Sequence, residues 1–384
     1  MPLLALFLIR ASAGYQFQAV AGAAPLLVTA GYDYAQVGLL VGAYMLPGIL
    51  VTVPAGYLSR TLGDQRVLTA GLFLMMAGTG LMAVDDGFAW LLAGRILSGT
   101  GGVVVLMLVI KMTADRYAGP WLSTATAVVI TSWYAGFAAA LLGSAWIAAH
   151  GGARLALIAS GVPAILGLLM VPFVGKPKPL ATGAAPSGHP VRVPWRFTAS
   201  ASLCWMQMNI GFAVIVGFLP AYLVALGWQA TAAGARASVL TWSAGVAAVA
   251  GGYVADRVLG RARAVVLGAA SCALLMALLP VSEAALLVLI GIGLSYALFP
   301  AALTAQVGEA TPQAARGEVF GWYSGASYVG LTVSPWMAGA LRDATGNPAA
   351  PIYLAAAVLA LLLPAYAWFC RETGRLNSSP TAPA

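Results

Sequence analysis

Long apolar runs separated by short polar breaks make up almost the whole of this chain. A helix needs about 20 apolar residues to cross the hydrocarbon core of a bilayer, and the runs are close to that length. They lack the alternation over about 10 residues that marks a membrane β-strand. The pattern therefore predicts twelve membrane helices. Their predicted ranges are 3–30, 36–58, 66–84, 88–112, 122–148, 155–174, 197–225, 233–254, 264–281, 285–307, 319–341 and 351–369.

Composition supports the same fold class. Of the 384 residues, 61% are hydrophobic and 8% are charged, whereas soluble domains carry about 25% charged residues. Such a chain cannot cover a water-facing surface, so we predict an all-α membrane protein embedded in a lipid bilayer. The stretch from Met1 to Ile9 is interpreted as the start of the first helix, because Arg10 interrupts it before any signal-peptide cleavage site. An earlier start codon stays open as an alternative.

A segment rich in Pro, Gly and basic residues divides the chain nearly in half. It covers 175–196 and is typical of a flexible linker. We therefore predict a first six-helix bundle over 1–174, a second over 197–370, and a tail over 371–384.

The distribution of Lys and Arg predicts the orientation of the helices. With the amino end inside, the inner side holds 14 basic residues and the outer loops hold 3, a bias that favours both termini in the cytoplasm. The three outer residues are Arg154, Arg236 and Arg342. The same bias explains most of the net charge of +8 without a nucleic-acid partner, and it is typical of the cytoplasmic (inner) membrane.

Short sequence matches in register indicate that the two halves repeat. Many secondary transporters are built from two parallel six-helix repeats, with the substrate site near the midplane between them. We predict that architecture here. The matched segments are Ala55-Gly56-Tyr57 with Gly251-Gly252-Tyr253, Gly31-Tyr32 with Gly227-Trp228, and Ser144-Ala145-Trp146 with Ser334-Pro335-Trp336.

The loop after the second predicted helix resembles the signature of the major facilitator superfamily, which has the form Gly-x-Leu-x-Asp-Arg-x-Gly-Arg-Lys. Its sequence here is Gly56-Tyr-Leu-Ser-Arg60-Thr-Leu-Gly63-Asp-Gln-Arg66, and the second half has Gly252-Tyr-Val-Ala-Asp256-Arg257-Val-Leu-Gly260-Arg261-Ala-Arg263. In the fourth helix, Arg95-Ile-Leu-Ser-Gly99-Thr-Gly101 is similar to the family's Arg-x-x-x-Gly-x-Gly motif. The resemblance covers essentially the whole chain and implies a secondary transporter.

One residue departs from that signature. The first-half loop has Arg60 where the family has an Asp that helps to latch the two halves together, so the resemblance places that role on Asp256. A basic inner loop without any latch is the alternative. The residues predicted for this signature-loop latch are Gly56, Arg60, Gly63, Gly252, Asp256, Arg257 and Arg261.

Two cations, Arg10 and Arg95, lie well inside predicted helices, while all eleven acidic residues lie in loops or near helix ends. An unpaired Arg at the centre of a bilayer costs about 2.5–3.5 kcal/mol on insertion scales. An anionic substrate is therefore a natural counter-charge, and the tract from Lys111 to Arg116 is also similar to cyanate- and nitrate-type permeases. Alternatively, Arg95 binds backbone carbonyls or mediates proton coupling, and Arg10 reaches the inner headgroups.

Polar and aromatic side chains on several helices are further candidates for a substrate site, although packing is their commoner role. Together with the two arginines, the predicted substrate-binding residues are Gln18, Trp133, Tyr134, Trp205, Asn209, Tyr296, Tyr323 and Ser327.

These features favour transport of a small organic or inorganic anion, by proton symport or by exchange. We expect no enzyme activity, cofactor or metal site, because the sequence lacks a phosphate-binding GxxxxGK[ST] loop, an HExxH motif and a catalytic constellation. We also expect a monomer, since one chain would hold both halves of the pathway. A proton-driven multidrug exporter and a transporter of neutral solutes remain as alternatives.

Overall fold

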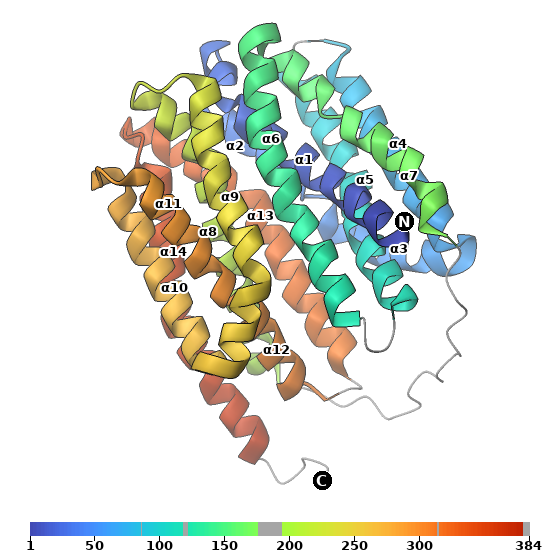
Figure 1. Cartoon of the computed structure of the whole chain (residues 1–384), viewed down its shortest axis with the longest axis vertical. Coiled ribbons are helices and arrows are strands. Elements are labelled where there is room, and N and C mark those ends of the chain that lie inside the picture. Colours follow the sequence, from blue (N-terminus) through green and yellow to red (C-terminus); the bar gives the residue numbers. More distant parts are fainter. Residues whose placement is uncertain (86, 118–121, 176–193, 313–314, 379–384) are drawn as a thin grey trace.

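The computed structural model describes residues 1–85, 87–117, 122–175, 194–312 and 315–378, and helices account for nearly all of them. The helices run side by side along the long axis of the molecule (Figure 1). The first group of helices is α1 (Pro2–Thr29), α2 (Tyr34–Gly42), α3 (Gly48–Leu62), α4 (Asp64–Met82), α5 (Phe88–Arg116), α6 (Leu122–Ala159) and α7 (Val162–Val174).

The second group follows residues 176–193, which lie outside the described ranges and contain most of the predicted linker. It comprises α8 (Trp195–Ala225), α9 (Ala230–Val254), the π-helix η1 (Ala255–Leu259), α10 (Arg261–Leu278), the 3₁₀-helix η2 (Leu279–Val281), α11 (Ala285–Leu298), α12 (Pro300–Ala310), α13 (Arg316–Thr345) and α14 (Ala350–Ser378).

These elements match the twelve predicted helices, with two of them broken. The second predicted helix divides into α2 and α3 around Pro47, and the tenth divides into α11 and α12 at Pro300. Proline lacks the N–H that would continue a helix. Conversely, two predicted helices are joined in α6. This helix continues through Gly152, whose positive φ of 86° marks a kink between the two predicted spans.

By length and composition, eight helical stretches among the described residues are apolar enough to cross a membrane. One of them, Ala125–Val174, is 50 residues long, which is about twice the length that a single crossing needs. The remaining predicted spans correspond to α2 with α3, to α4 and to α13. The last helix also differs from its prediction, because α14 continues to Ser378, past the predicted end at 369.

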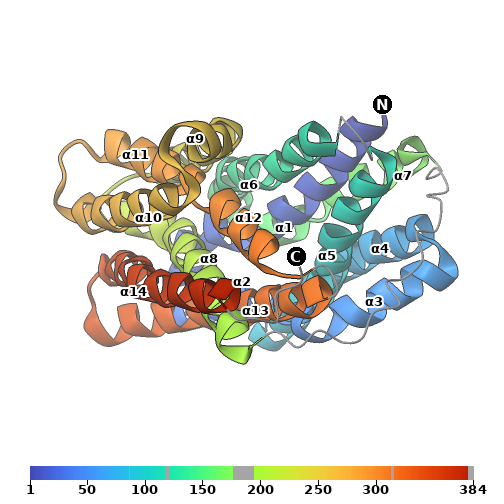
Figure 2. The same ribbon diagram turned by 90° about the horizontal axis from the view of Figure 1, so that it is seen from below.

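The two groups of helices lie beside each other, as the view from below shows (Figure 2). They meet where α2 packs on α13, where α6 packs on α9 and where α1 packs on α8. Glycines allow the first two contacts: an added Cβ at Gly38 would meet the backbone of Pro335, and one at Gly234 would meet the backbone of Leu141. Small residues at such crossings let helix backbones approach closely.

Candidate functional site

Arg10 of α1 lies against α6, close to where the two groups of helices meet. Its Nη1 donates hydrogen bonds to the backbone oxygens of Val129 at 2.9 Å and Ile130 at 3.0 Å. The guanidinium carbon lies 5.7 Å from the centre of the Trp133 ring. Its Nε is buried and has no hydrogen-bond partner. Arg10 therefore has part of its donor capacity fixed by α6 and part of it unused.

Aromatic side chains from both groups of helices lie near this arginine. Tyr134 on α6 and Tyr328 on α13 lie within electrostatic range of the Arg10 guanidinium. Trp133 packs against Phe17, at 5.7 Å between ring centres, and against Phe137, at 4.7 Å, and these two rings also contact each other. Arg10 thus has an aromatic and hydroxyl-bearing environment, and no acidic group of the described residues pairs with it.

Arg95 of α5 has a different environment. It is only 1% exposed, and it donates hydrogen bonds to the backbone oxygens of Leu40 at 2.8 Å, Gln16 at 2.6 Å and Phe17 at 3.0 Å. Its guanidinium also lies 4.7 Å from the centre of the Tyr44 ring. The structure therefore shows the alternative in which Arg95 binds backbone carbonyls, joining α5 to α1 and α2.

A chain of aromatic rings connects the two groups of helices near Arg10. Phe212 of α8 lies 6.3 Å from Phe137 and 5.9 Å from Tyr134, both on α6. On its other side, Phe212 stacks on Tyr296 of α11 at 4.3 Å. Two of the predicted residues, Tyr134 and Tyr296, therefore contact the same ring. That ring belongs to Phe212, which was not among the predicted residues. Phe212 could have been found by its helical spacing from Trp205 and Asn209.

The other predicted residues separate into two sets. Trp205 stacks on Tyr323 at 4.7 Å, and Gln18 donates a hydrogen bond to the Val216 backbone oxygen at 3.0 Å, from α1 to α8. By contrast, Asn209 and Ser327 each donate to a carbonyl of their own helix. The structure thus brings Arg10, Trp133 and Tyr134 together, places Tyr296, Trp205 and Tyr323 in aromatic pairs of the second half, and leaves the amide of Asn209 occupied.

The two signature loops keep the same backbone turn. Gly63 and Gly260 have φ values of 89° and 78°, a conformation that residues with a Cβ rarely adopt. Each glycine ends one helix and starts the next, α4 or α10. The two halves therefore repeat in backbone geometry at this point, although their side chains differ in charge.

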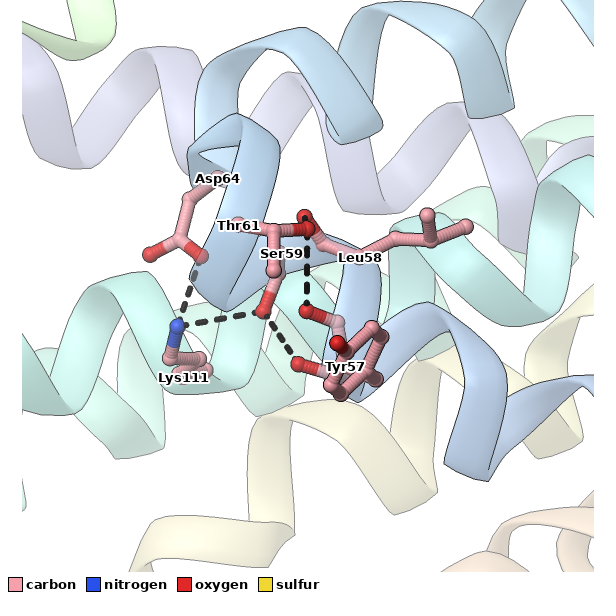
Figure 3. A network of polar contacts seen from close by, with 7 residues as sticks. Tyr57, Leu58, Ser59, Thr61, Asp64 and Lys111 are labelled. Atoms are coloured by element: carbon pink, nitrogen blue, oxygen red, sulfur yellow. Dashed lines mark hydrogen bonds and ion pairs between the residues drawn. The ribbon is translucent and has the colours of Figure 1, made fainter.

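The charges around these glycines are inverted between the halves. Asp64, the first residue of α4, accepts a hydrogen bond from Lys111 of α5 at 2.6 Å, and Lys111 also reaches Ser59 (Figure 3). In the second half Arg261, the first residue of α10, pairs with Glu309 of α12. Each pair joins the start of one helix to the end of another in the same half. The role of the signature loops as a latch between halves stays a prediction.

The remaining residues of the predicted signature-loop latch are at the surface or in open space. Arg60 and Arg257 are exposed, and a Cβ added at Gly56 or Gly252 would contact nothing within 4 Å. Asp256 pairs with Arg261 at 2.6 Å, an exposed pair of the kind that contributes about 0–1 kcal/mol.

Exchanging the charges of Asp64 and Lys111 should test whether these two residues stabilise the first half as a simple ion pair. The Asp64 side chain is 9% exposed and that of Lys111 is 40% exposed, so Lys111→Met would leave a largely buried carboxylate without its partner. We expect Lys111→Met to lower the free energy of unfolding by about 1–2 kcal/mol. The double variant Asp64→Arg, Lys111→Glu, which imitates the second half, should recover part of that loss.

Thermal unfolding of the purified variants measures both effects. Recovery should be incomplete, because an acidic residue at the start of a helix is favoured by the helix dipole and a basic one is not. A double variant that is less stable than Lys111→Met would contradict the simple ion pair.

Comparison with known proteins assigns the family. The model of the Major Facilitator Superfamily matches residues 6–282 and 201–383. The inner membrane transport protein YajR of Escherichia coli (strain K12) is 27% identical over 86 residues, which are 22% of this chain and 19% of that protein. The chain thus aligns with about a fifth of that relative's length.

Two solved structures resemble the whole fold. A bacterial homologue of the human lysosomal transporter Spinster, in an inward-facing and occupied conformation, has a TM-score of 0.76 at 15% identity and covers 99% of this chain and 98% of its own. The xylose transporter XylE of E. coli, in an inward open conformation, has a TM-score of 0.76 at 14% identity, over 95% and 94% of the two chains. Together with the repeated helices and signature loops described above, these matches show that the chain belongs to the major facilitator superfamily of membrane transporters.

Proposed function

We propose that this transporter moves a small organic or inorganic anion across the cytoplasmic membrane by alternating access, through proton coupling or exchange. The observation that supports this proposal most directly is the environment of Arg10. Its buried Nε has no partner, and the groups described near it are two backbone carbonyls, the Trp133 ring and two tyrosines within electrostatic range. A bound anion would supply the counter-charge that the protein itself does not.

The positions of the acidic residues add to this argument. Every described Asp and Glu lies in a connection or within the first or last two turns of a helix. An Arg inside a membrane normally pairs with another group or lines a route for a charged solute. Because Arg95 already binds three carbonyls, we assign the substrate contact to Arg10 and a structural role to Arg95.

We also propose that both termini lie in the cytoplasm and that one chain forms the whole pathway. The excess of Lys and Arg on the side of the termini supports this orientation. In it, the end of the molecule that holds Tyr34 and Arg342 faces outward. The polar contacts between the two halves at that end favour an inward-facing state, which is also the state named for the two related structures.

A neutral substrate such as a sugar has less support in this chain, even though XylE is a xylose transporter. Sugar hydroxyls need side-chain donors and acceptors, but Asn209 and Ser327 bind carbonyls of their own helices. A drug exporter that binds cations would need a carboxylate at membrane depth, and none of the described residues supplies one. Both alternatives are nevertheless outcomes that the following experiment can return.

Thermal unfolding of the purified protein against a panel of small anions, sugars and lipophilic cations tests the proposal. A ligand that binds only the folded state adds about 2.7 kcal/mol at 100 times its dissociation constant. We expect an anion of one chemical class to raise the unfolding temperature of the wild-type protein. Arg10→Ala should abolish that rise, because it removes the cation.

Arg236→Ala is a matched control. Arg236 also places its guanidinium over a tryptophan ring, that of Trp228 at 3.5 Å, but it lies in the second turn of α9, at the other end of the molecule from Arg10. This variant should keep the full response to the anion. Stabilisation by sugars or cations alone, or an anion response that survives in Arg10→Ala, would contradict the proposed anion site.

A further inference from the structure

A single acidic side chain joins the two halves at the end of the molecule that holds Tyr34 and Arg342, which we call the Tyr34 end. The carboxylate of Asp343, near the end of α13, accepts hydrogen bonds from the backbone N–H groups of Tyr34 at 3.2 Å and Ala35 at 2.8 Å. These are the first two residues of α2. The first N–H groups of a helix have no partner inside it, and its positive end favours a negative charge.

The neighbouring residues complete the partners of this helix start. Asp33 accepts a hydrogen bond from the N–H of Gln36 at 2.6 Å, and the Gln36 side chain accepts one from the N–H of Asp33. The N–H groups of Tyr34 and Ala35 therefore depend on Asp343, which is about 308 residues away in the sequence. When the halves separate at this end, both groups lose their protein partner.

Arg342 makes a second contact across the same boundary. Its Nη2 donates a hydrogen bond to the Tyr34 hydroxyl at 2.8 Å, and its guanidinium carbon lies 3.7 Å from the centre of the Tyr34 ring. The residue is 5% exposed. A cation held over a tyrosine ring in a desolvated site is attracted by the ring more strongly than at an exposed one.

The opposite end of the molecule has no equivalent among the contacts described. The ion pairs at the signature loops, Lys111 with Asp64 and Arg261 with Asp256, each join residues of the same half. Arg60 stands where the superfamily signature has an acid, and it is exposed. Of the contacts described for residues 1–85, 87–117, 122–175, 194–312 and 315–378, those in which a charged side chain joins the two halves lie at the Tyr34 end.

We propose that Asp343 and Arg342 form a latch with Tyr34 and the start of α2. This α2–α13 latch determines the fraction of transporter molecules in which the two halves are closed at the Tyr34 end. This proposal does not depend on which substrate is carried. A carboxylate that accepts two backbone N–H groups makes charge-assisted hydrogen bonds, which are the stronger kind. Losing them removes an interaction that exists only in the closed arrangement, so the equilibrium must move toward separation.

Distance measurement by double electron–electron resonance tests the latch. Spin labels at His150→Cys on α6 and Ala235→Cys on α9 report on the separation of the halves, because both positions are exposed at this end. The exposed native Cys370 is first replaced by serine. Asp343→Asn keeps the size of the side chain but removes its charge and one acceptor. It should raise the ratio of separated to closed molecules by about tenfold.

Asp85→Asn is the matched control. Asp85 is also an exposed acid that accepts a backbone hydrogen bond, from Gly87 at 2.6 Å, but both residues belong to the first half. Its distance distribution should equal that of the parent protein. The latch is refuted if Asp343→Asn leaves the distribution unchanged, or if both variants lengthen the distance equally. Size-exclusion profiles and unfolding temperatures show that each variant is folded, and Asp343→Glu, which keeps the charge, should restore part of the closed population.

Discussion

Replacement of Arg95 by alanine is expected to lower the free energy of unfolding by about 3 kcal/mol, the largest loss of stability that we predict for a single side chain. Arg95 joins α5 to backbone oxygens on both α1 and α2. The bond to Leu40 matters most, because that carbonyl belongs to the last turn of α2, where the helix breaks and its carbonyls lack partners within the helix. The substitution would also leave a cavity beside Tyr44.

Two further variants separate the charge of Arg95 from its geometry. Arg95→Lys keeps the charge but has a compact ammonium in place of the planar fork, so we expect it to recover less than half of the loss. Arg154→Ala is a control at a less buried arginine, which donates to the Ala83 carbonyl from the end of the bundle, and it should cost about 1 kcal/mol or less. The measurement is the unfolding temperature and the yield of monodisperse protein.

A different result would reassign Arg95. If Arg95→Ala unfolded at the wild-type temperature but no longer responded to an anion that stabilises the wild-type protein, Arg95 would be a substrate contact. The carbonyls would then be temporary partners that the arginine leaves when a substrate binds.

The helical fold was predictable because each crossing of a membrane needs a long apolar run, which the sequence displays directly. The helix breaks were harder to predict. Pro300 separates α11 from α12. Pro47 likewise lies at the break between α2 and α3, although the apolar pattern alone continues through that break. Contacts with α5 and α13 stabilise it there: Arg95 binds Leu40, and Tyr328 packs at Gly48.

The candidate site was only partly predictable. Helical spacing puts Arg10 on one face with Gly14 and Phe17, and the structure packs that face against α6 around Trp133. The spacing could not show which nearby groups belong to other helices. Tyr328, which lies within electrostatic range of Arg10, comes from α13.

The contact between Asp343 and the start of α2 was likewise hidden in the sequence. It depends on how two helices from different halves are aligned, and each residue alone resembles an ordinary helix end. One clue was present in the sequence, since glycines such as Gly38 and Gly42 recur at the spacing that lets two helices pack closely.

Introducing a methyl group at Gly38 is expected to hold the Tyr34 end open and to reduce transport about 100-fold or more. An added Cβ would lie closer to the backbone oxygen of Pro335 than the 3.0 Å that real Cβ atoms respect, and no side-chain rotation can relieve a clash with backbone. Because Gly42 faces Thr332 and Gly339 faces Tyr34 in the same way, the whole contact between α2 and α13 has to separate. Packed interfaces respond to such changes by changing state, since they deform little.

Gly217→Ala is the control for the change of residue itself, because a Cβ at this buried position of α8 would meet nothing within 4 Å. Alanine is favoured over glycine in a helix by about 1 kcal/mol, so this variant should be at least as stable as the parent and transport normally. The spin labels at His150→Cys and Ala235→Cys should show a longer distance in Gly38→Ala alone. Transport near the wild-type level in Gly38→Ala would mean that close contact of α2 with α13 is unnecessary for the transport cycle.

If transport were lost while the distance between the spin labels stayed unchanged, the defect would not lie in closure of the Tyr34 end. Only the combination of an open Tyr34 end and lost transport supports the view that the small residues of α2 permit closure and that Asp343 stabilises the closed state once the helices meet.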